Sequence, residues 1–186
     1  GMGDGVAKTG YPNKNIHIIP NSSDISFFQL NKKLKIGLQN KYKWNVGDKI
    51  IIYTGTLGEI NGVEYLVDIA NEFTEINNKV KLLIVGDGIE EQAIRNKAKI
   101  YNCLDNNLFL INQLPKNKMP GLYNLSTIAT SLFIPLKEME ANSANKFFDT
   151  LAAGKPIVIN YGGWQKDLIE KHNIGLVLAR DPKVAA

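Results

Sequence analysis

Cysteine and histidine are almost absent from this chain of 186 residues. The single cysteine is Cys103, and the two histidines are His17 and His172. One thiol cannot close a disulfide within the chain or build a cysteine-based metal cluster, so both kinds of site are excluded. We expect a reduced, cytoplasmic setting, with no metal and no other resident cofactor.

Long apolar runs are also missing. No segment approaches the roughly 20 apolar residues that a membrane-spanning helix needs, and the N-terminal residues lack the charged and then apolar pattern of a signal peptide. The composition, with 44% hydrophobic and 22% charged residues, is that of an ordinary globular domain with one core. The sequence therefore predicts a protein that neither spans a membrane nor is exported.

Several common catalytic patterns do not occur. The chain contains no Ser-His-Asp arrangement, no metal-spaced histidines and no P-loop. The run Gly86-Asp87-Gly88 begins like a dinucleotide fingerprint, but Glu91 stands where the third glycine belongs. Glu90 and Glu91 would repel a pyrophosphate at the first turn of the following helix. A nicotinamide-dependent dehydrogenase is therefore disfavoured.

Positive charge is concentrated near the N-terminus. The formal net charge is +4, and residues 1–50 hold eight lysines against three aspartates, so the remainder is slightly acidic. Tyr42 and Trp44 lie among these lysines, a pattern that suits anionic lipid headgroups or nucleic acid. A solvated surface helix is the favoured alternative. We expect at most a peripheral contact with an anionic membrane, and no nucleic acid. The lysines concerned are Lys32, Lys33, Lys35, Lys41 and Lys43.

From residue 49 onward, short β-branched runs alternate with longer helical patterns, which indicates a parallel sheet covered on both faces. The fold class is α/β, with a doubly wound and mostly parallel sheet over residues 49–186. Residues 1–48, here called the linker segment, are expected to contain one strand at Ile16–Ile19. The further strands are predicted at 49–54, 80–85, 108–111, 127–134, 156–160 and 175–178. Helices are predicted near 62–75, 89–102, 117–124, 143–153 and 164–172.

The helix at 143–153 is the strongest candidate for a binding element. Ser143 suits its N-cap, Gly154 suits the left-handed position after its end, and Pro156 prevents its continuation. At about 100° per residue, four polar side chains share one face and four apolar side chains the other. The polar set is Asn142, Asn145, Lys146 and Asp149, and the apolar set is Phe147, Phe148, Leu151 and Ala152.

This polar face suits a nucleotide. The free N–H groups of the first turn carry the positive end of the helix dipole, and Lys146 adds a full charge beside them, which favours a phosphate. Asp149, one turn further on, is placed to accept hydrogen bonds from ribose hydroxyls. The alternative is an ordinary amphipathic helix in which Lys146 and Asp149 form a surface pair.

Glycine-rich loops follow three of the predicted strands. They are Gly55-Thr56-Leu57-Gly58, Gly86-Asp87-Gly88 and Gly162-Gly163. Ligands of open parallel sheets bind outside the carboxyl ends of the strands, and glycine lets the backbone approach them closely. Each loop alone is explained by a tight turn. Together they favour a ligand site in which residues 55–58 form the wall opposite the 143–153 helix.

The order of these motifs resembles the C-terminal half of a retaining, family-4 (group 1) glycosyltransferase of the GT-B fold. The resemblance runs from Pro20-Asn21-Ser22-Ser23-Asp24 to the end of the chain and rests on the runs at 53–58, 85–88, 143–146 and 152–156. It implies a Rossmann-like domain that binds a nucleotide-diphospho-sugar without metal. It further implies that the base lies against Asn112, Gln113 and Leu114, and the ribose against Asp149. The remaining donor contacts implied are Gly55, Thr56, Gly58, Gly86, Gly88, Ser143, Ala144, Asn145 and Lys146, with Glu140 and Lys146 in catalytic roles.

The chain departs from the family pattern in its charged residues. Members often carry an arginine and a lysine where this chain has Thr56 and Asn61, so Lys146 is expected to take over their charge. The family's pair of glutamates has become Asp149 and Glu140, and the latter lies one residue out of register. Glu140 and its neighbour Glu138 either bind sugar hydroxyls or belong to a solvated loop.

The start and end of the 143–153 helix resemble those of enzymes that transfer N-acetylated amino sugars in bacterial surface-polysaccharide assembly, which implies a UDP-sugar donor. A GT-B enzyme has two such halves, so this half is expected to bind donor without transferring sugar. A saccharide or lipid-linked acceptor would then bind through the other half. Two alternatives remain: a nucleotide-sugar epimerase of the same fold, and a doubly wound interaction domain without catalysis.

Overall fold

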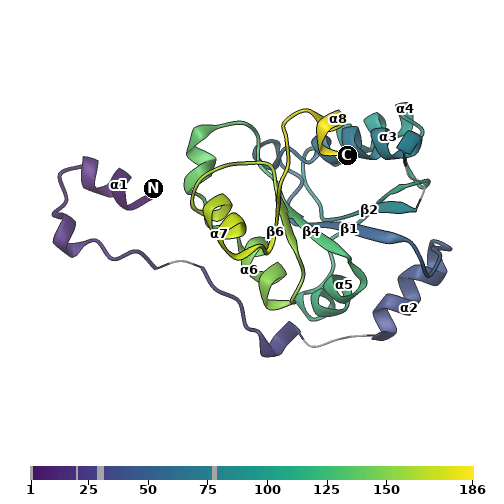
Figure 1. Ribbon diagram of the computed structural model, residues 1–186, viewed down its shortest axis with the longest axis horizontal. Coiled ribbons are helices and arrows are strands. Elements are labelled where there is room, and N and C mark those ends of the chain that lie inside the picture. Colours follow the sequence, from purple (N-terminus) through teal and green to yellow (C-terminus); the bar gives the residue numbers. More distant parts are fainter. Residues whose placement is uncertain (1, 20, 29–31, 77–78) are drawn as a thin grey trace.

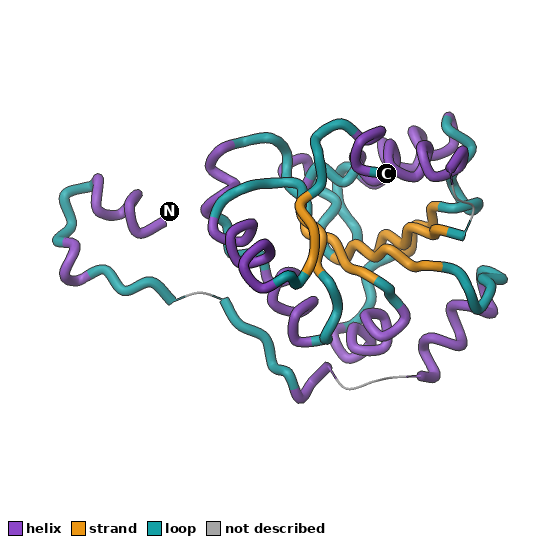
Figure 2. Tube along the Cα trace, in the orientation of Figure 1, coloured by secondary structure: helices purple, strands orange, loops and turns teal. Residues whose placement is uncertain are grey.

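The computed structural model describes residues 2–19, 21–28, 32–76 and 79–186. Its centre is a six-stranded, all-parallel sheet of order β3-β2-β1-β4-β5-β6, with helices on both faces (Figures 1 and 2). The strand order reverses between β1 and β4, and this switch point is where open α/β sheets bind ligands. The α/β doubly wound fold is thereby confirmed. The strands are β1 Lys49–Thr54, β2 Val80–Val85, β3 Leu108–Ile111, β4 Ile128–Ser131, β5 Ile157–Ile159 and β6 Gly175–Val177.

The helices form two layers. Figure 1 shows α3, α4 and α8 on one side of the sheet, and α2, α5 and α6 on the other. The α-helices are α1 Met2–Lys8, α2 Lys32–Lys41, α3 Glu64–Ile76, α4 Glu91–Ile100, α5 Met119–Leu125, α6 Asn145–Ala152, α7 Trp164–His172 and α8 Pro182–Ala185. Short 3-10 helices are η1 Asn13–Asn15, η2 Ser26–Phe28, η3 Glu59–Asn61, η4 Lys116–Lys118 and η5 Lys137–Ala141.

The first three strands form at the residues that the sequence predicts. Their bounds are as expected, since continuous apolar runs such as Leu82–Val85 are buried on both faces. The predicted strand at Ile16–Ile19 is wrong, because no strand forms there. Ile18 and Ile19 are 79% and 87% exposed, and no strand of the described chain pairs with them. Alternating apolar residues alone did not make a strand here.

The aromatic residues among the lysines belong to the core. Trp44 is only 7% exposed, its ring stacks on Tyr42 at 5.3 Å between centroids, and both rings contact Phe109 of β3. These rings are therefore not displayed to a lipid or nucleic acid, which favours the interpretation of α2 as a surface helix. The side chains of Lys32, Lys33 and Lys35 lie outside the described residues.

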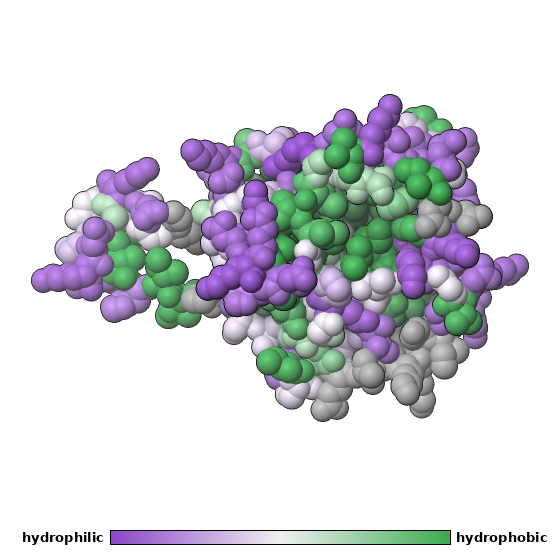
Figure 3. All heavy atoms as spheres, viewed as in Figure 1, coloured by the Kyte–Doolittle hydropathy of each residue, from purple (hydrophilic) through white to green (hydrophobic). Residues whose placement is uncertain are grey.

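Apolar side chains gather on the face between the strands and the α3–α8 layer (Figure 3). On this side Ile51, Tyr65, Phe73 and Leu178 pack against the buried cluster but are only partly covered themselves. Within the described residues, no helix has both the length and the apolar character needed to cross a bilayer.

Candidate binding site

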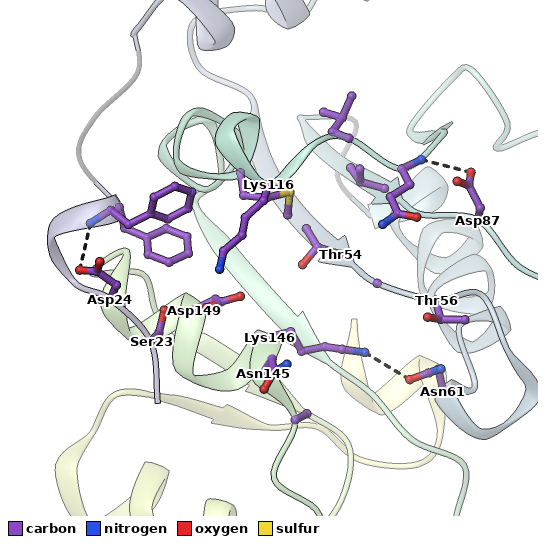
Figure 4. A pocket seen from close by; sticks show the side chains of 18 of the residues that line it. Ser23, Asp24, Thr54, Thr56, Asn61, Asp87, Lys116, Asn145, Lys146 and Asp149 are labelled. Atoms are coloured by element: carbon purple, nitrogen blue, oxygen red, sulfur yellow. Dashed lines mark hydrogen bonds between the residues drawn. The ribbon is translucent and has the colours of Figure 1, made fainter. Parts of the chain in front are cut away.

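A cavity of about 910 Å³ opens beside the carboxyl ends of the strands. Its walls are formed by the linker segment around η2, the loops after β1 and β3, and the start of α6 (Figure 4). The cavity therefore lies next to the switch point between β1 and β4, where the topology predicts a ligand. Eight of the predicted site residues line it: Gly55, Thr56, Gln113, Leu114, Ala144, Asn145, Lys146 and Asp149.

Helix α6 begins at Asn145, two residues after the predicted start at residue 143. Ala144 is the N-cap residue, and its own side chain makes no capping hydrogen bond. Ser143 stands one residue before the cap, and its hydroxyl accepts the N–H of Asn21 at 3.3 Å. The side chain of Asn142 accepts the Ala144 N–H at 3.1 Å and does not line the cavity. In the described chain, the N–H groups of Asn145 and Lys146 make no hydrogen bond and remain available to a ligand.

The rest of α6 follows the predicted pattern. Phe147 and Thr150 are fully buried, while Asn145, Lys146 and Asp149 line the cavity. Gly154 has φ +65°, and the N–H of Lys155 bonds to the Thr150 carbonyl at 3.1 Å, which completes a Schellman motif. The helix thus presents one face to the core and the other to the cavity.

Lys146 is the central charged group of the cavity. Its ammonium donates to the Tyr53 hydroxyl at 3.1 Å and to the Asn61 side-chain oxygen at 3.2 Å. It also lies 4.4 Å from the centroid of the Tyr53 ring, and no carboxylate of the described chain forms an ion pair with it. Burial lowers the pKa of Lys146 to about 8. At neutral pH, the site therefore holds a protonated cation without a counter-charge, which favours an anionic ligand.

The carboxylates that line the cavity already accept hydrogen bonds from other residues of the chain. Asp149 accepts the Ser23 hydroxyl at 2.6 Å through one oxygen. Asp87 accepts the Gln113 N–H at 3.1 Å and so ties the loop after β2 to the loop after β3. Asp24 accepts the Ser26 hydroxyl and the N–H groups of residues 26 and 27, and these bonds lower its pKa. Among the described residues, these bonds all reach the Oδ1 atom of each carboxylate, so Oδ2 of Asp149 keeps its acceptor sites on the α6 face that lines the cavity.

The glycines of the loops divide into two groups. Gly55 lines the cavity, and a Cβ there would lie 3.3 Å from the Lys146 ammonium, so the absent side chain makes room for this lysine. Gly58, Gly86 and Gly88 do not line the cavity. A Cβ at Gly86 would lie 1.8 Å from the Gly55 carbonyl oxygen, and one at Gly88 would lie 2.3 Å from that of Leu57. These two glycines allow one loop to pack on another.

Glu140 also lies outside the cavity. It is an exposed residue of η5, and its side chain and carbonyl lie against the turn at Gly162 and Gly163. The loop is held there because Asn142 O accepts the Trp164 indole N–H at 2.9 Å. In this loop the Glu140 side chain therefore lies beside the turn at Gly162, outside the cavity that Lys146 lines.

Sequence reasoning missed the wall that comes from the linker segment. Ser22, Ser23 and Asp24 line the cavity together with Phe27 and Phe28. More than 100 residues separate them from α6, so no local periodicity pointed to them. The available signal was Asp24 followed by Ser26, a pattern that begins a short helix. Lys116 enters the same cavity with its ammonium 5.6 Å from the Phe27 ring centroid.

Within the described residues, no group of three or more His, Cys, Asp and Glu is placed to hold a metal ion.

Most of the chain matches one protein family. Residues 36–186 match the family model described as glycosyl transferases group 1. Spore coat protein SA of Bacillus subtilis (strain 168) is 23% identical over 138 residues, which are 71% of this chain and 35% of that protein. HepE of Anabaena, solved with UDP and glucose, superposes with a TM-score of 0.77 at 15% identity over 98% of this chain and 48% of that chain.

One of the similar solved structures is a single domain, and this chain covers most of it. The C-terminal domain of a group 1 glycosyl transferase (LpcC) from Francisella tularensis has a TM-score of 0.66 at 15% identity, covering 87% of this chain and 83% of that one. The present chain thus spans about a third of spore coat protein SA and about half of HepE. The resemblance to a C-terminal half is confirmed.

Proposed function

This chain belongs to the group 1 family of glycosyl transferases, and from that premise we propose that its cavity holds the nucleoside diphosphate of a sugar donor. The observation that carries this proposal is Lys146, a partly buried cation without a carboxylate partner in the described chain, beside the free N–H groups of α6. A diphosphate would satisfy both features, since helix N-termini and lysines bind phosphate oxygens.

Lys146 replaces the charge that the family pattern places elsewhere. Asn61 occupies the position of a usual lysine, and its side-chain oxygen accepts a hydrogen bond from Lys146 at 3.2 Å. The cation thus reaches the loop after β1 from α6, on the other side of the cavity. We take this as the means by which the site keeps a positive charge while Thr56 and Asn61 are neutral.

The remaining walls suit the other parts of a nucleotide. The second oxygen of Asp149 would accept a ribose hydroxyl, and the loop at Gln113 and Leu114 would face the base. Phe27 and Phe28 give the far side of the cavity an apolar, aromatic surface. A complex of HepE contains UDP and glucose, which supports uracil as the base. The sequence at the start and end of helix α6 resembles that of enzymes that transfer N-acetylated amino sugars, which supports such a sugar in the donor.

In the transfer reaction, the diphosphate is the leaving group. Negative charge grows on it as the bond to the sugar breaks, and donors fixed where charge develops stabilise the transition state. Lys146 and the amides of α6 would supply these donors with no metal ion. We propose retaining transfer, with a saccharide or lipid-linked acceptor and its binding groups contributed by another domain.

Calorimetric titration with UDP, uridine and GDP tests the proposal. UDP should bind at least tenfold more tightly than uridine, because a hydrogen bond to a charged group contributes about 1.5–3 kcal/mol. Lys146→Ala should weaken UDP by about that factor and leave uridine nearly unchanged. If Lys146→Ala weakened the affinity for UDP and for uridine equally, the assignment would be contradicted. It would also be contradicted if the unmodified chain bound neither UDP nor GDP. Tighter binding of GDP would keep the diphosphate site and change the base.

The pH dependence of binding provides a second prediction. Free Lys146 has a pKa of about 8, and a bound diphosphate would raise it, since an opposite charge favours the protonated form. UDP affinity should therefore be nearly constant between about pH 7 and pH 8 and fall by up to tenfold per pH unit above pH 8. The terminal phosphate, whose pKa is about 6, is fully ionised in this range. A flat profile between pH 7 and 9 in the unmodified chain would contradict the role of Lys146, and Lys146→Arg should give such a profile.

A further inference from the structure

We propose that Ser23 is a positioning residue that fixes the Asp149 carboxylate and so lets the site select nucleotides that carry ribose hydroxyls. This inference rests on the proposed function, because it assigns a partner to the sugar-facing carboxylate of the same cavity. No motif within the linker segment predicts this role. It follows from one hydrogen bond and from the way the segment is held.

The hydrogen bond has a defined direction. Ser23 Oγ lies 2.6 Å from Asp149 Oδ1, and both residues line the cavity. An ionised carboxylate only accepts hydrogen bonds, so the serine hydroxyl donates. The contact is short and charge-assisted, which places it among the stronger hydrogen bonds of proteins. It occupies Oδ1 and leaves Oδ2 for a ligand.

The serine is held on both sides. Before it, the Asn21 side chain donates to Asn145 Oδ1 at 2.8 Å, and Asn21 N–H bonds to Ser143 Oγ. After it, Asp24 accepts the N–H groups of residues 26 and 27 at the start of η2. The Phe28 ring then packs on Tyr123, with 5.5 Å between the ring centroids. Ser23 therefore presents its hydroxyl from a fixed backbone.

Asp149 has few other constraints. No cation of the described chain forms an ion pair with it, and the terminal torsion of an aspartate side chain has a broad, two-fold preference. Without Ser23, the carboxylate would rotate more freely and lose orientation before the ligand arrives. Preorganised groups bind more tightly because less freedom is lost on binding. Ser23 would thus contribute to affinity only when ribose hydroxyls are present.

The test compares UDP with 2′,3′-dideoxy-UDP on the full chain. Ser23→Ala should weaken UDP about 3- to 10-fold, because the Asp149 side chain must then lose its freedom when UDP binds, and leave the dideoxy analogue within twofold. Ser23→Thr keeps a hydroxyl and should restore most of the UDP affinity. Ile25→Ala is the control for disturbance of the segment, because Ile25 is 76% exposed and does not line the cavity.

Each outcome decides between explanations. Equal weakening of both nucleotides by Ser23→Ala would show a purely structural role and overturn the inference, as would unchanged UDP affinity. Equal affinity of the unmodified chain for the two nucleotides would overturn it as well, while the diphosphate site at Lys146 would stand. If the unmodified chain binds neither nucleotide, the proposed function itself fails.

Discussion

Replacing Lys146 by methionine is expected to stabilise the fold and to abolish tight UDP binding. Burial lowers the pKa of this lysine from 10.5 to about 8, so folding at pH 7 places a protonated amine where its charge is disfavoured. One pKa unit corresponds to about 1.4 kcal/mol, which sets an upper limit of about 3 kcal/mol on this penalty. Methionine keeps a similar length without the charge. We expect the free energy of unfolding, measured in urea at pH 7, to rise by about 2 kcal/mol.

The pH dependence of the stability difference distinguishes removal of the charge from better packing of the methionine side chain. The penalty is complete below about pH 8 and disappears toward pH 10.5, because the folded lysine loses its proton first. The unmodified chain should therefore gain stability relative to Lys146→Met through this range. Lys146→Arg keeps the charge and should show no stabilisation at pH 7. A stability difference that stays constant from pH 7 to pH 10.5, or a less stable methionine variant, would contradict the argument.

This combination of effects is typical of a functional site. A partly buried cation that has no carboxylate partner in the described part of the chain lowers stability, and such a group is retained where it serves binding. Tyr53 and Asn61 hold the ammonium by hydrogen bonds but cannot neutralise it. Bound UDP would supply the missing negative charge, so it should raise the stability of the unmodified chain more than that of Lys146→Met.

The sequence was sufficient for elements that depend on local pattern. The strands at 49–54, 80–85 and 108–111 were predicted with their observed bounds, because a buried parallel strand is a short, continuous apolar run. The end of α6 was equally clear, since Gly154 adopts the left-handed conformation that a helix C-terminus favours. The polar face at Asn145, Lys146 and Asp149 followed from helical periodicity alone.

The start of α6 and the wall opposite it depended on distant residues. Ser143 has the chemistry of an N-cap, but the helix begins one residue later than this requires, and the Ser143 hydroxyl accepts the N–H of Asn21, 122 residues away. Ser23 reaches Asp149 across a similar separation. Such contacts are set by how the linker segment packs on the finished domain, and no short pattern in the sequence encodes them. The same reason applies to Glu140, whose side-chain carboxylate lies beside Gly162.

Gly86→Ala is expected to destabilise the domain strongly, although Gly86 does not line the cavity. An added Cβ would lie 1.8 Å from the Gly55 carbonyl oxygen, and both partners are backbone at the ends of β2 and β1. Overpacking of a rigid site costs about 1–3 kcal/mol and occasionally more, and here no flexible side chain can move aside. We expect a loss of about 3 kcal/mol in the free energy of unfolding in urea.

Gly58→Ala is the matched control, because it makes the same change in the neighbouring loop. Gly58 has φ −116°, and its added Cβ would meet nothing closer than 3.8 Å. Its stability should stay within about 0.5 kcal/mol of the unmodified chain, as for most surface substitutions. If Gly86 served the nucleotide directly, Gly86→Ala would weaken UDP binding at unchanged stability. Stability loss in Gly86→Ala together with a stable Gly58→Ala would instead show that this glycine joins two loops, and that the cavity depends on the distance between them.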